Sequence, residues 1–194
     1  MKTIIAAADL ISGNDVESAK SLISAEYPHV FIQYDKRRMS AYEKLKIYVR
    51  DGFVDQYDGS RLVFPNVLRI LSSKLENTFP YHPNWKMSDC HIAYWELVPT
   101  CDHIVPIARG GVDDEKNIVT TSMKNNSSKL NFLPEEVGFV LRNKGNLPRW
   151  DGLIGWYKSY IRENPIDLDG SMKEWDEALV RYERENGEFK EASY

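Results

Sequence analysis

Cysteine is scarce in this chain, with two residues, Cys90 and Cys101, among 194. Two cysteines are too few for the disulfide framework of a small secreted domain, so we expect free thiols and a reducing, cytoplasmic setting. One alternative is a residual metal site that adds His82 and His91 to the two cysteines. The spacing of these four residues matches no common zinc pattern, and free thiols are the expectation.

Long apolar runs are also missing. Residues 1–11 are apolar in part, but the run is short, Asp9 interrupts it and only Lys2 precedes it. We therefore expect neither a signal peptide nor a membrane span. Basic residues are not in excess either, because the formal net charge is −4. Affinity for phosphates comes from clustered Lys and Arg, so this balance argues against indiscriminate DNA binding.

The charge that is present is unevenly distributed. Residues 35–50 hold six basic and two acidic residues, and residues 141–162 hold five and one, so each segment carries +4. Residues 163–194 carry −6. We expect the basic segments, with Arg37 and Arg38 in the first, to contact nucleic acid. The alternative for residues 35–50 is a solvated helix face. In residues 141–162, Arg149-Trp150 and Trp156-Tyr157 could stack on bases, but packing in the core is the favoured interpretation. The acidic end is either a solvated face or a partner-binding tail.

The remaining composition, 42% hydrophobic and 28% charged, is that of an ordinary globular protein with a real core. Apolar residues at helical spacing, with capping and stop residues at the ends, predict helices at 14–26, 66–76, 134–144, 151–162 and 171–186. Strands are predicted at 29–34 and 61–64. Residues 79–90, rich in proline and aromatics, are predicted to form an irregular loop.

The most informative stretch is 94–132. It begins with a predicted strand at 94–98, followed by Asp102 and His103, and a Gly-rich turn and an acidic loop then lead to a second predicted strand at 117–120. Ser122 is expected to cap a helix that runs to about residue 131. Two strands and a helix would bring Asp102, His103 and Asn126 together.

These three side chains suit phosphodiester hydrolysis. A carboxylate and an amide oxygen are hard ligands that favour Mg²⁺ or Mn²⁺ over Zn²⁺. An imidazole titrates near neutrality and can therefore take a proton from water. The alternative is that these residues have no catalytic role. An Asp-His pair recurs by chance, and a lone histidine is more often a surface or core residue.

The order of residues resembles the HNH (ββα-metal) endonuclease family. The matching residues are Asp102-His103-Ile104-Val105-Pro106, Gly110-Gly111, Asp113, Asn117-Ile118 and Asn126 with Lys129. The resemblance implies an α+β protein with a ββα-metal core among several helices. It also implies that Asp102 and Asn126 bind the metal and that His103 is the general base. Asn117 would orient the loop that holds the histidine, and Lys129 would lie near the DNA backbone.

One departure concerns the structural zinc of many family members, which four cysteines hold. Asp55 and Asp58 stand at the positions of the first cysteine pair, within the segment 50–59, and Ser122 and Asn125 stand at those of the second. All four cysteines are replaced together, so we expect no structural zinc. Packing and hydrogen bonds must then steady the core.

By this resemblance the chain divides into an extension at 1–49, a nuclease core at 50–132 with an insertion at about 61–93, and a helical region at 133–194. The insertion either shapes substrate choice or supplies packing that replaces the zinc. The expected activity is metal-dependent hydrolysis of DNA with Mg²⁺ or Mn²⁺, leaving 5′-phosphate and 3′-hydroxyl ends. Arg109 joins the expected DNA contacts, and cutting both strands would need a homodimer or two successive nicks. Two alternatives stay open: an enzyme for RNA or structured nucleic acid, and an inactive binding module.

Overall fold

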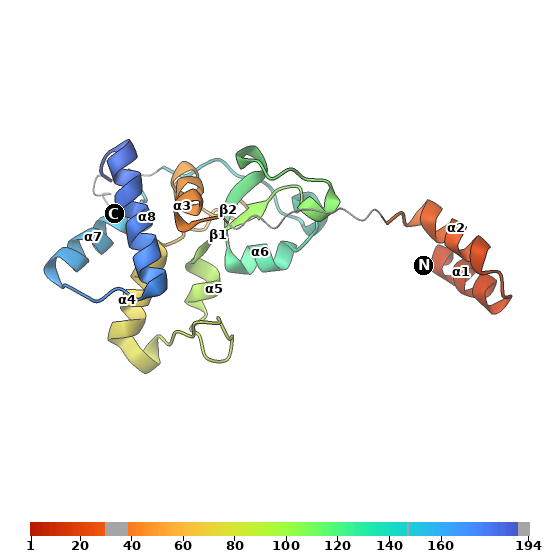
Figure 1. Ribbon diagram of the computed structural model, residues 1–194, viewed down its shortest axis with the longest axis horizontal. Helices are drawn as coiled ribbons and strands as arrows, with labels where there is room; N and C mark the ends of the chain where they lie inside the picture. The colour runs from red at the N-terminus through yellow and green to blue at the C-terminus, as the bar shows by residue number, and fades with distance from the viewer. Residues whose placement is uncertain (30–38, 147, 190–194) are drawn as a thin grey trace. The chain divides into compact units, whose positions relative to one another are not determined.

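The computed structural model describes residues 1–29, 39–146 and 148–189, and its fold is mixed α+β (Figure 1). The chain forms two compact units, Met1–Asp35 and Lys36–Tyr194. Residues 39–49 and the C-terminal helices lie in the same unit as the hairpin. Nowhere in the described ranges is a helix both long and apolar enough to cross a membrane.

The first unit is a pair of helices, α1 (Lys2–Ser12) and α2 (Val16–Glu26). The side chain of Asp15 caps α2 by accepting a hydrogen bond from the Ser18 amide at 3.1 Å, within the helix predicted at 14–26. Helix α1 was not among the predicted elements. The expected strand at 29–34, apart from residue 29, and the expected contacts of Arg37 and Arg38 lie outside the described residues.

The second unit contains an antiparallel hairpin of β1 (Pro99–His103) and β2 (Ile118–Ser122), in which Asp102 pairs with Val119. Helix α6 (Met123–Lys129) follows at once, and the Ser122 side chain caps it by accepting from the Asn125 amide at 3.1 Å. The predicted second strand and capped helix are therefore confirmed, with the helix ending two residues early.

The expected first strand at 94–98 is wrong, because α5 (Ala93–Leu97) occupies those positions and the strand begins at Pro99. A run of five apolar-rich residues is compatible with the periodicity of a strand and with that of a helix, so tertiary packing decides which of the two forms. Here Tyr94 is buried in the core and its hydroxyl donates to the Leu68 carbonyl at 2.9 Å.

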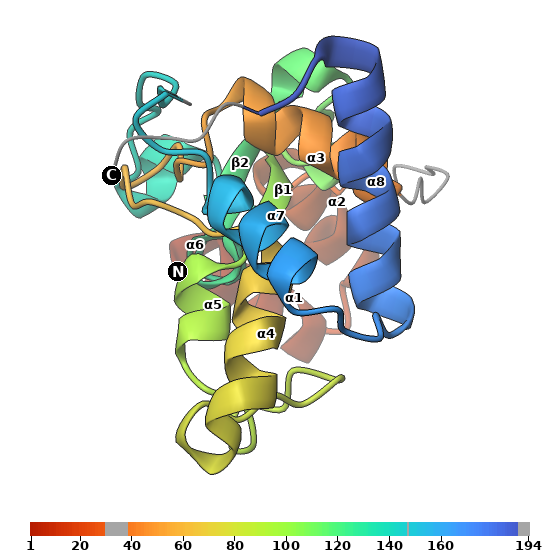
Figure 2. The same cartoon turned by 90° about the vertical axis from the view of Figure 1, so that its left-hand side faces the viewer.

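Four helices surround the core of this unit: α3 (Ala41–Arg50), α4 (Pro65–Leu75), α7 (Ile154–Glu163) and α8 (Gly170–Asn186). Helix α8 packs against α3 and α4, and α7 against α4 (Figure 2). Their buried side chains, such as Leu45, Phe64, Leu68, Ile154 and Leu179, form one hydrophobic cluster. The predicted helices at 66–76, 151–162 and 171–186 are confirmed within about three residues at each end.

Two further predictions are wrong. Residues 61–64 form no strand and contribute one bridge, between Val54 and Arg61. The helix expected at 134–144 is a short 3₁₀ turn, η4 (Pro134–Val137), followed by irregular chain. The amides of Arg142 and Gly145 donate to the carbonyls of Gln56 and Asp51, both at 2.9 Å. These bonds to the 51–60 segment take the place of intrahelical bonds. The other 3₁₀ turns are η1 (Glu76–Thr78), η2 (Ile107–Arg109) and η3 (Glu115–Asn117).

Candidate active site

Helix α6 lies against the β1 side chains of Thr100 and Asp102, which share one face of the strand because side chains alternate along it. The Asn126 Nδ2 atom donates to Thr100 Oγ1 at 3.1 Å. One turn later, Lys129 Nζ lies 2.9 Å from Asp102 Oδ2 and donates to the His103 carbonyl at 2.8 Å. The hairpin and α6 therefore place Asp102, His103 and Asn126 close together, as the sequence predicted.

Lys129 does not lie where the resemblance placed it. Its side chain is 0% exposed, enclosed between α6 and the end of β1, so its ammonium has no open path to a DNA backbone. A buried ammonium requires an opposite charge and hydrogen-bond acceptors, and Asp102 and the His103 carbonyl supply both. The expected surface contact is corrected to a buried ion pair that holds Asp102.

Tyr57 is a second partner of Asp102 that the sequence did not reveal. Its hydroxyl donates to Asp102 Oδ2 at 2.6 Å, and its ring stacks on Phe139 with centroids 5.0 Å apart. Burial, together with the adjacent carboxylate, raises the pKa of Tyr57 far above its usual value, so the hydroxyl remains a donor. Both contacts engage Oδ2, and Asp102 Oδ1 has no protein partner in the described part of the chain.

His103 ends β1 with a side chain that is 30% exposed. Its Nε2 lies 3.0 Å from Asp113 Oδ1. Because a carboxylate only accepts hydrogen bonds, we infer that Nε2 carries the proton and that the Nδ1 lone pair is available. The motif match included Asp113, but the sequence did not indicate this contact with the imidazole.

Asn117 clamps the loop between His103 and β2. Its Oδ1 accepts from the Val105 amide at 2.9 Å, and its Nδ2 donates to the carbonyls of Val105 and Val112 at 2.9 and 2.8 Å. The loop is closed so tightly that a Cβ on Gly111 would lie 1.9 Å from the Val105 oxygen. These contacts are the ones expected of a residue that orients the loop behind His103.

The segment 50–59 runs beside β2 and ties it to the end of α3. The Arg50 guanidinium donates to the Ile118 carbonyl at 2.6 Å, and buried Asp51 accepts from the Thr120 amide at 2.8 Å. The Gln56 amide donates in turn to the Thr120 carbonyl at 2.9 Å. The hairpin is therefore supported along its outer edge as well as by α6.

Asp55, Asp58, Ser122 and Asn125, the four residues at the zinc-ligand positions, come together here and form what we call the Asp55 cluster. The Asp55 carboxylate, 0% exposed, accepts from the Ser122 amide at 2.7 Å and from Asn125 Nδ2 at 3.0 Å. Asn125 Nδ2 also donates to Asp58 Oδ2 at 2.8 Å. Burial raises the pKa of Asp58, but hydrogen bonds from Ser60 and Asn125 outweigh it and hold that pKa below its usual value. Hydrogen bonds therefore join these positions, as expected for a core steadied without the cysteines.

The site opens into a cavity of about 840 Å³, whose lining includes His103, Asp113 and Asn126. Arg109, expected to contact DNA, is exposed and forms an ion pair with Glu136. Both cysteines are free thiols, and burial raises the pKa of the Cys101 thiol to about 12.

The possible metal donors are Asp102 Oδ1 and Asn126 Oδ1, both hard oxygen atoms without a partner in the described ranges. Within those ranges no three His, Cys, Asp or Glu side chains gather as a metal-binding group. A search of family models, curated proteins and solved structures found no match to this chain.

Proposed function

We propose that this protein is a metal-dependent endonuclease whose active site is an HNH-type ββα-metal arrangement of β1, β2 and α6. The observation that carries the proposal is the packing of α6 along β1: Asn126 donates to Thr100, and Lys129 of the same helix pairs with Asp102 and donates to the His103 carbonyl. Asn117 supports it by closing the loop behind the histidine. Asp113 and Tyr57 add hydrogen bonds that orient His103 and Asp102.

The donor atoms fit one Mg²⁺ or Mn²⁺ ion. Asp102 Oδ1 and Asn126 Oδ1 would hold it, and a bound ion supplies charge neutralisation at the phosphate and at the leaving oxygen. The Lys129 ammonium, 2.9 Å from Asp102 Oδ2, offsets the carboxylate charge. We therefore expect weak metal binding by the protein alone and tighter binding when a substrate phosphate adds its own charge.

His103 is the proposed general base. Its Nδ1 accepts a proton from water while the water oxygen bonds to phosphorus and the bond to the 3′ oxygen breaks. The products are a 5′-phosphate and a 3′-hydroxyl, the ends that the resemblance implies. Asp113 holds Nε2 at 3.0 Å and stabilises the imidazolium that forms.

Supercoiled plasmid with Mg²⁺ or Mn²⁺ tests the proposal directly. The wild-type protein should nick or linearise the plasmid, and EDTA should stop the reaction. His103→Ala should lower the cleavage rate by about 10²- to 10⁴-fold, the usual contribution of a general base. A matched control is His29→Ala, which removes an exposed histidine of the other compact unit. Cleavage by His103→Ala at the wild-type rate overturns the assignment.

A further inference from the structure

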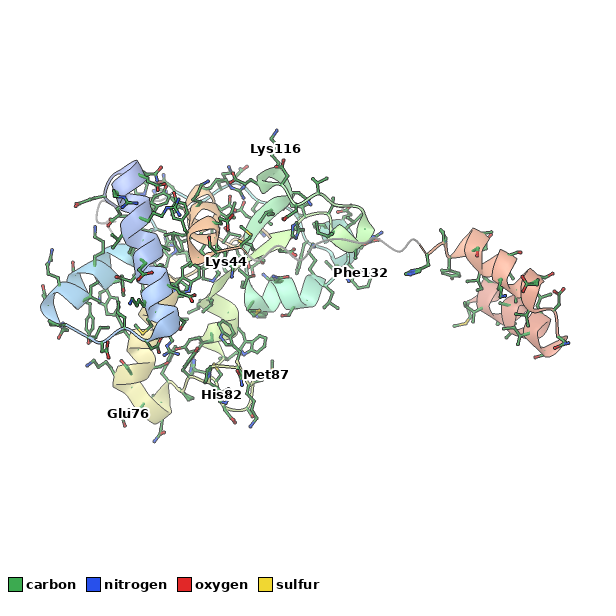
Figure 3. All side chains as sticks on the ribbon, in the orientation of Figure 1. Lys44, Glu76, His82, Met87, Lys116 and Phe132 are labelled. Carbon is green, nitrogen blue, oxygen red and sulfur yellow. The ribbon has the colours of Figure 1, made fainter. Side chains whose placement is uncertain are left out.

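The cavity beside the candidate active site extends well beyond the catalytic residues. Its volume of about 840 Å³ lies within the range of small-molecule and cofactor pockets. His103 and Asn126 line one part of it, and helices α3, α4, α5 and α8 with the 79–92 loop contribute further lining. The loop and α3 can be followed in Figure 3, where His82 and Met87 mark the loop and Lys44 marks α3. The size exceeds what a single phosphate group would occupy.

Aromatic side chains form much of this lining, and Tyr81, Trp85, Tyr94 and Trp175 are the four that matter here. Trp85 meets Tyr94 edge-on with ring centroids 5.8 Å apart, and Tyr81 lies 5.1 Å from Tyr94. The Trp85 backbone has a φ of 50°, a left-handed conformation that costs a non-glycine residue free energy. Tyr94 is buried and supports Trp85 from the side, and the half-buried Trp85 ring is the kind of aromatic surface on which an unpaired base stacks.

Positive charge lies within the same cavity. Lys44 has no ion pair with any residue in the described ranges, and Arg69 packs over the Tyr81 ring at 3.6 Å while pairing with Asp169. Two acids, Asp113 and Glu174, also line the cavity, but Asp113 is engaged by His103. Lys44 is therefore the residue best able to meet a backbone phosphate.

A buried polar atom in the lining also lacks a partner. Asn66 is fully buried, and its Nδ2 donates to the Tyr157 hydroxyl at 3.1 Å and to the Met172 carbonyl at 2.9 Å. Its Oδ1 has no hydrogen-bond partner among the residues that the structure describes. An unmet buried acceptor is costly, and a donor such as the exocyclic amine of adenine, cytosine or guanine would satisfy it.

We propose that this cavity is a base pocket, which receives an unstacked base of the substrate strand while the neighbouring phosphodiester faces His103. The position of that phosphodiester rests on the proposed nuclease function, whereas the pocket itself rests on the aromatic rings, Lys44 and Asn66. The substrate class that follows is nucleic acid with unpaired nucleotides. DNA and RNA share this chemistry.

Binding measured without cleavage tests the pocket. Fluorescence anisotropy in EDTA would compare three labelled duplexes: one fully paired, one with a single bulged adenosine, and one with an abasic residue in the bulge. The bulged adenosine should bind about tenfold more tightly than the other two, as one stacked base contributes. Trp85→Ala should abolish this preference and Trp85→Phe should keep most of it, with unchanged thermal unfolding as the check on folding.

Trp156→Ala is the matched control, because Trp156 stacks on Tyr160 of α7 and is not part of the cavity lining. It should retain the tenfold preference. Equal binding of the adenosine and abasic bulges overturns the proposal, as does an unchanged preference in Trp85→Ala or no binding of any duplex. An RNA duplex with the same bulge shows which nucleic acid the pocket favours.

The two proposals fail separately. Plasmid cleavage that depends on His103, without any bulge preference, would overturn the proposed base pocket and support the proposed nuclease function. A bulge preference that depends on Trp85, without cleavage of any substrate, would support the proposed base pocket and overturn the proposed nuclease function.

Discussion

Two polar groupings flank the same hairpin and differ in how completely their hydrogen bonds are made. In the Asp55 cluster, the carboxylate of Asp55 accepts from four donors, on Tyr57, Thr121, Ser122 and Asn125. At the candidate active site, Asp102 Oδ1 and Asn126 Oδ1 have no partner within the described ranges. A saturated network holds a fold together, whereas oxygen lone pairs without a protein partner are available to a ligand.

The largest change in folding stability is expected when the Asp55 cluster is replaced by four cysteines that can bind a metal ion. The combined variant Asp55→Cys, Asp58→Cys, Ser122→Cys and Asn125→Cys replaces four hydrogen-bonded positions with zinc ligands. We expect it to be unfolded without zinc and folded with one bound Zn²⁺, because structural zinc contributes about 10 kcal/mol or more. Circular dichroism with and without a chelator measures this. Indifference to zinc would show that the four positions do not converge as described.

The next largest effect is expected from Asp55→Ala. Its removal leaves buried donors on Tyr57, Thr121 and Ser122 unsatisfied, so stability should fall by about 3 kcal/mol or more. Urea unfolding measures the change. Asp58→Ala is the matched control, since Asp58 is exposed and should cost less than about 1 kcal/mol. Equal losses for the two aspartates would contradict the comparison.

A substitution in the active-site loop should affect cleavage more than stability. Gly111→Ala forces a Cβ into the Val105 carbonyl and opens the loop that Asn117 clamps. We expect a loss of cleavage of about 10- to 100-fold, the usual effect of displacing a supporting contact. Gly170→Ala is the control, because nothing lies within 4 Å of its added Cβ. A Gly111→Ala protein with wild-type cleavage kinetics would show that the conformation of this loop does not affect activity.

A smaller effect is expected from Tyr57→Phe. The change removes one hydrogen bond to Asp102 Oδ2 and keeps the ring stacked on Phe139, so stability should fall by about 1 kcal/mol. Manganese titration in the presence of an uncleavable oligonucleotide should show weaker metal binding, because Asp102 is less firmly oriented. Tyr27→Phe, at an exposed position, should change neither quantity.

The smallest expected effect is the dependence of stability on pH. It requires no substitution in the Asp55 cluster or in the candidate active site. Burial raises the pKa values of Tyr94 and Cys101 to about 12. Their neutral forms are favoured in the folded state, so their contribution is complete below the unfolded pKa values, about 10 for tyrosine and about 8.5 for cysteine. It is lost as the pH rises toward 12. Thermal unfolding between pH 7 and 11 should therefore show a plateau and then a decline. A decline that begins below pH 8 would contradict this.

The sequence predicted the second strand of the hairpin, the Ser122 cap and three of the four core helices because these depend on local periodicity and capping. It misassigned 94–98 and 134–144, where packing of Tyr94 and backbone bonds from Arg142 and Gly145 to the 51–60 segment override local preference. The sequence did not predict the role of Tyr57 for a similar reason. Its contact with Asp102 spans 45 positions, and no spacing rule covers such a distance.

The sequence by itself determined which residue types stand on the second half of β1 and on α6, since Asp102 and His103 are adjacent and Asn126 follows on a capped helix. Only the tertiary structure decided that Lys129 is buried against Asp102, that Asp113 holds His103 and that Asp55, Asp58, Ser122 and Asn125 close into a hydrogen-bonded cluster. The physical reason is that burial and pairing depend on what surrounds a side chain. Neighbours in space come from segments far apart in the chain.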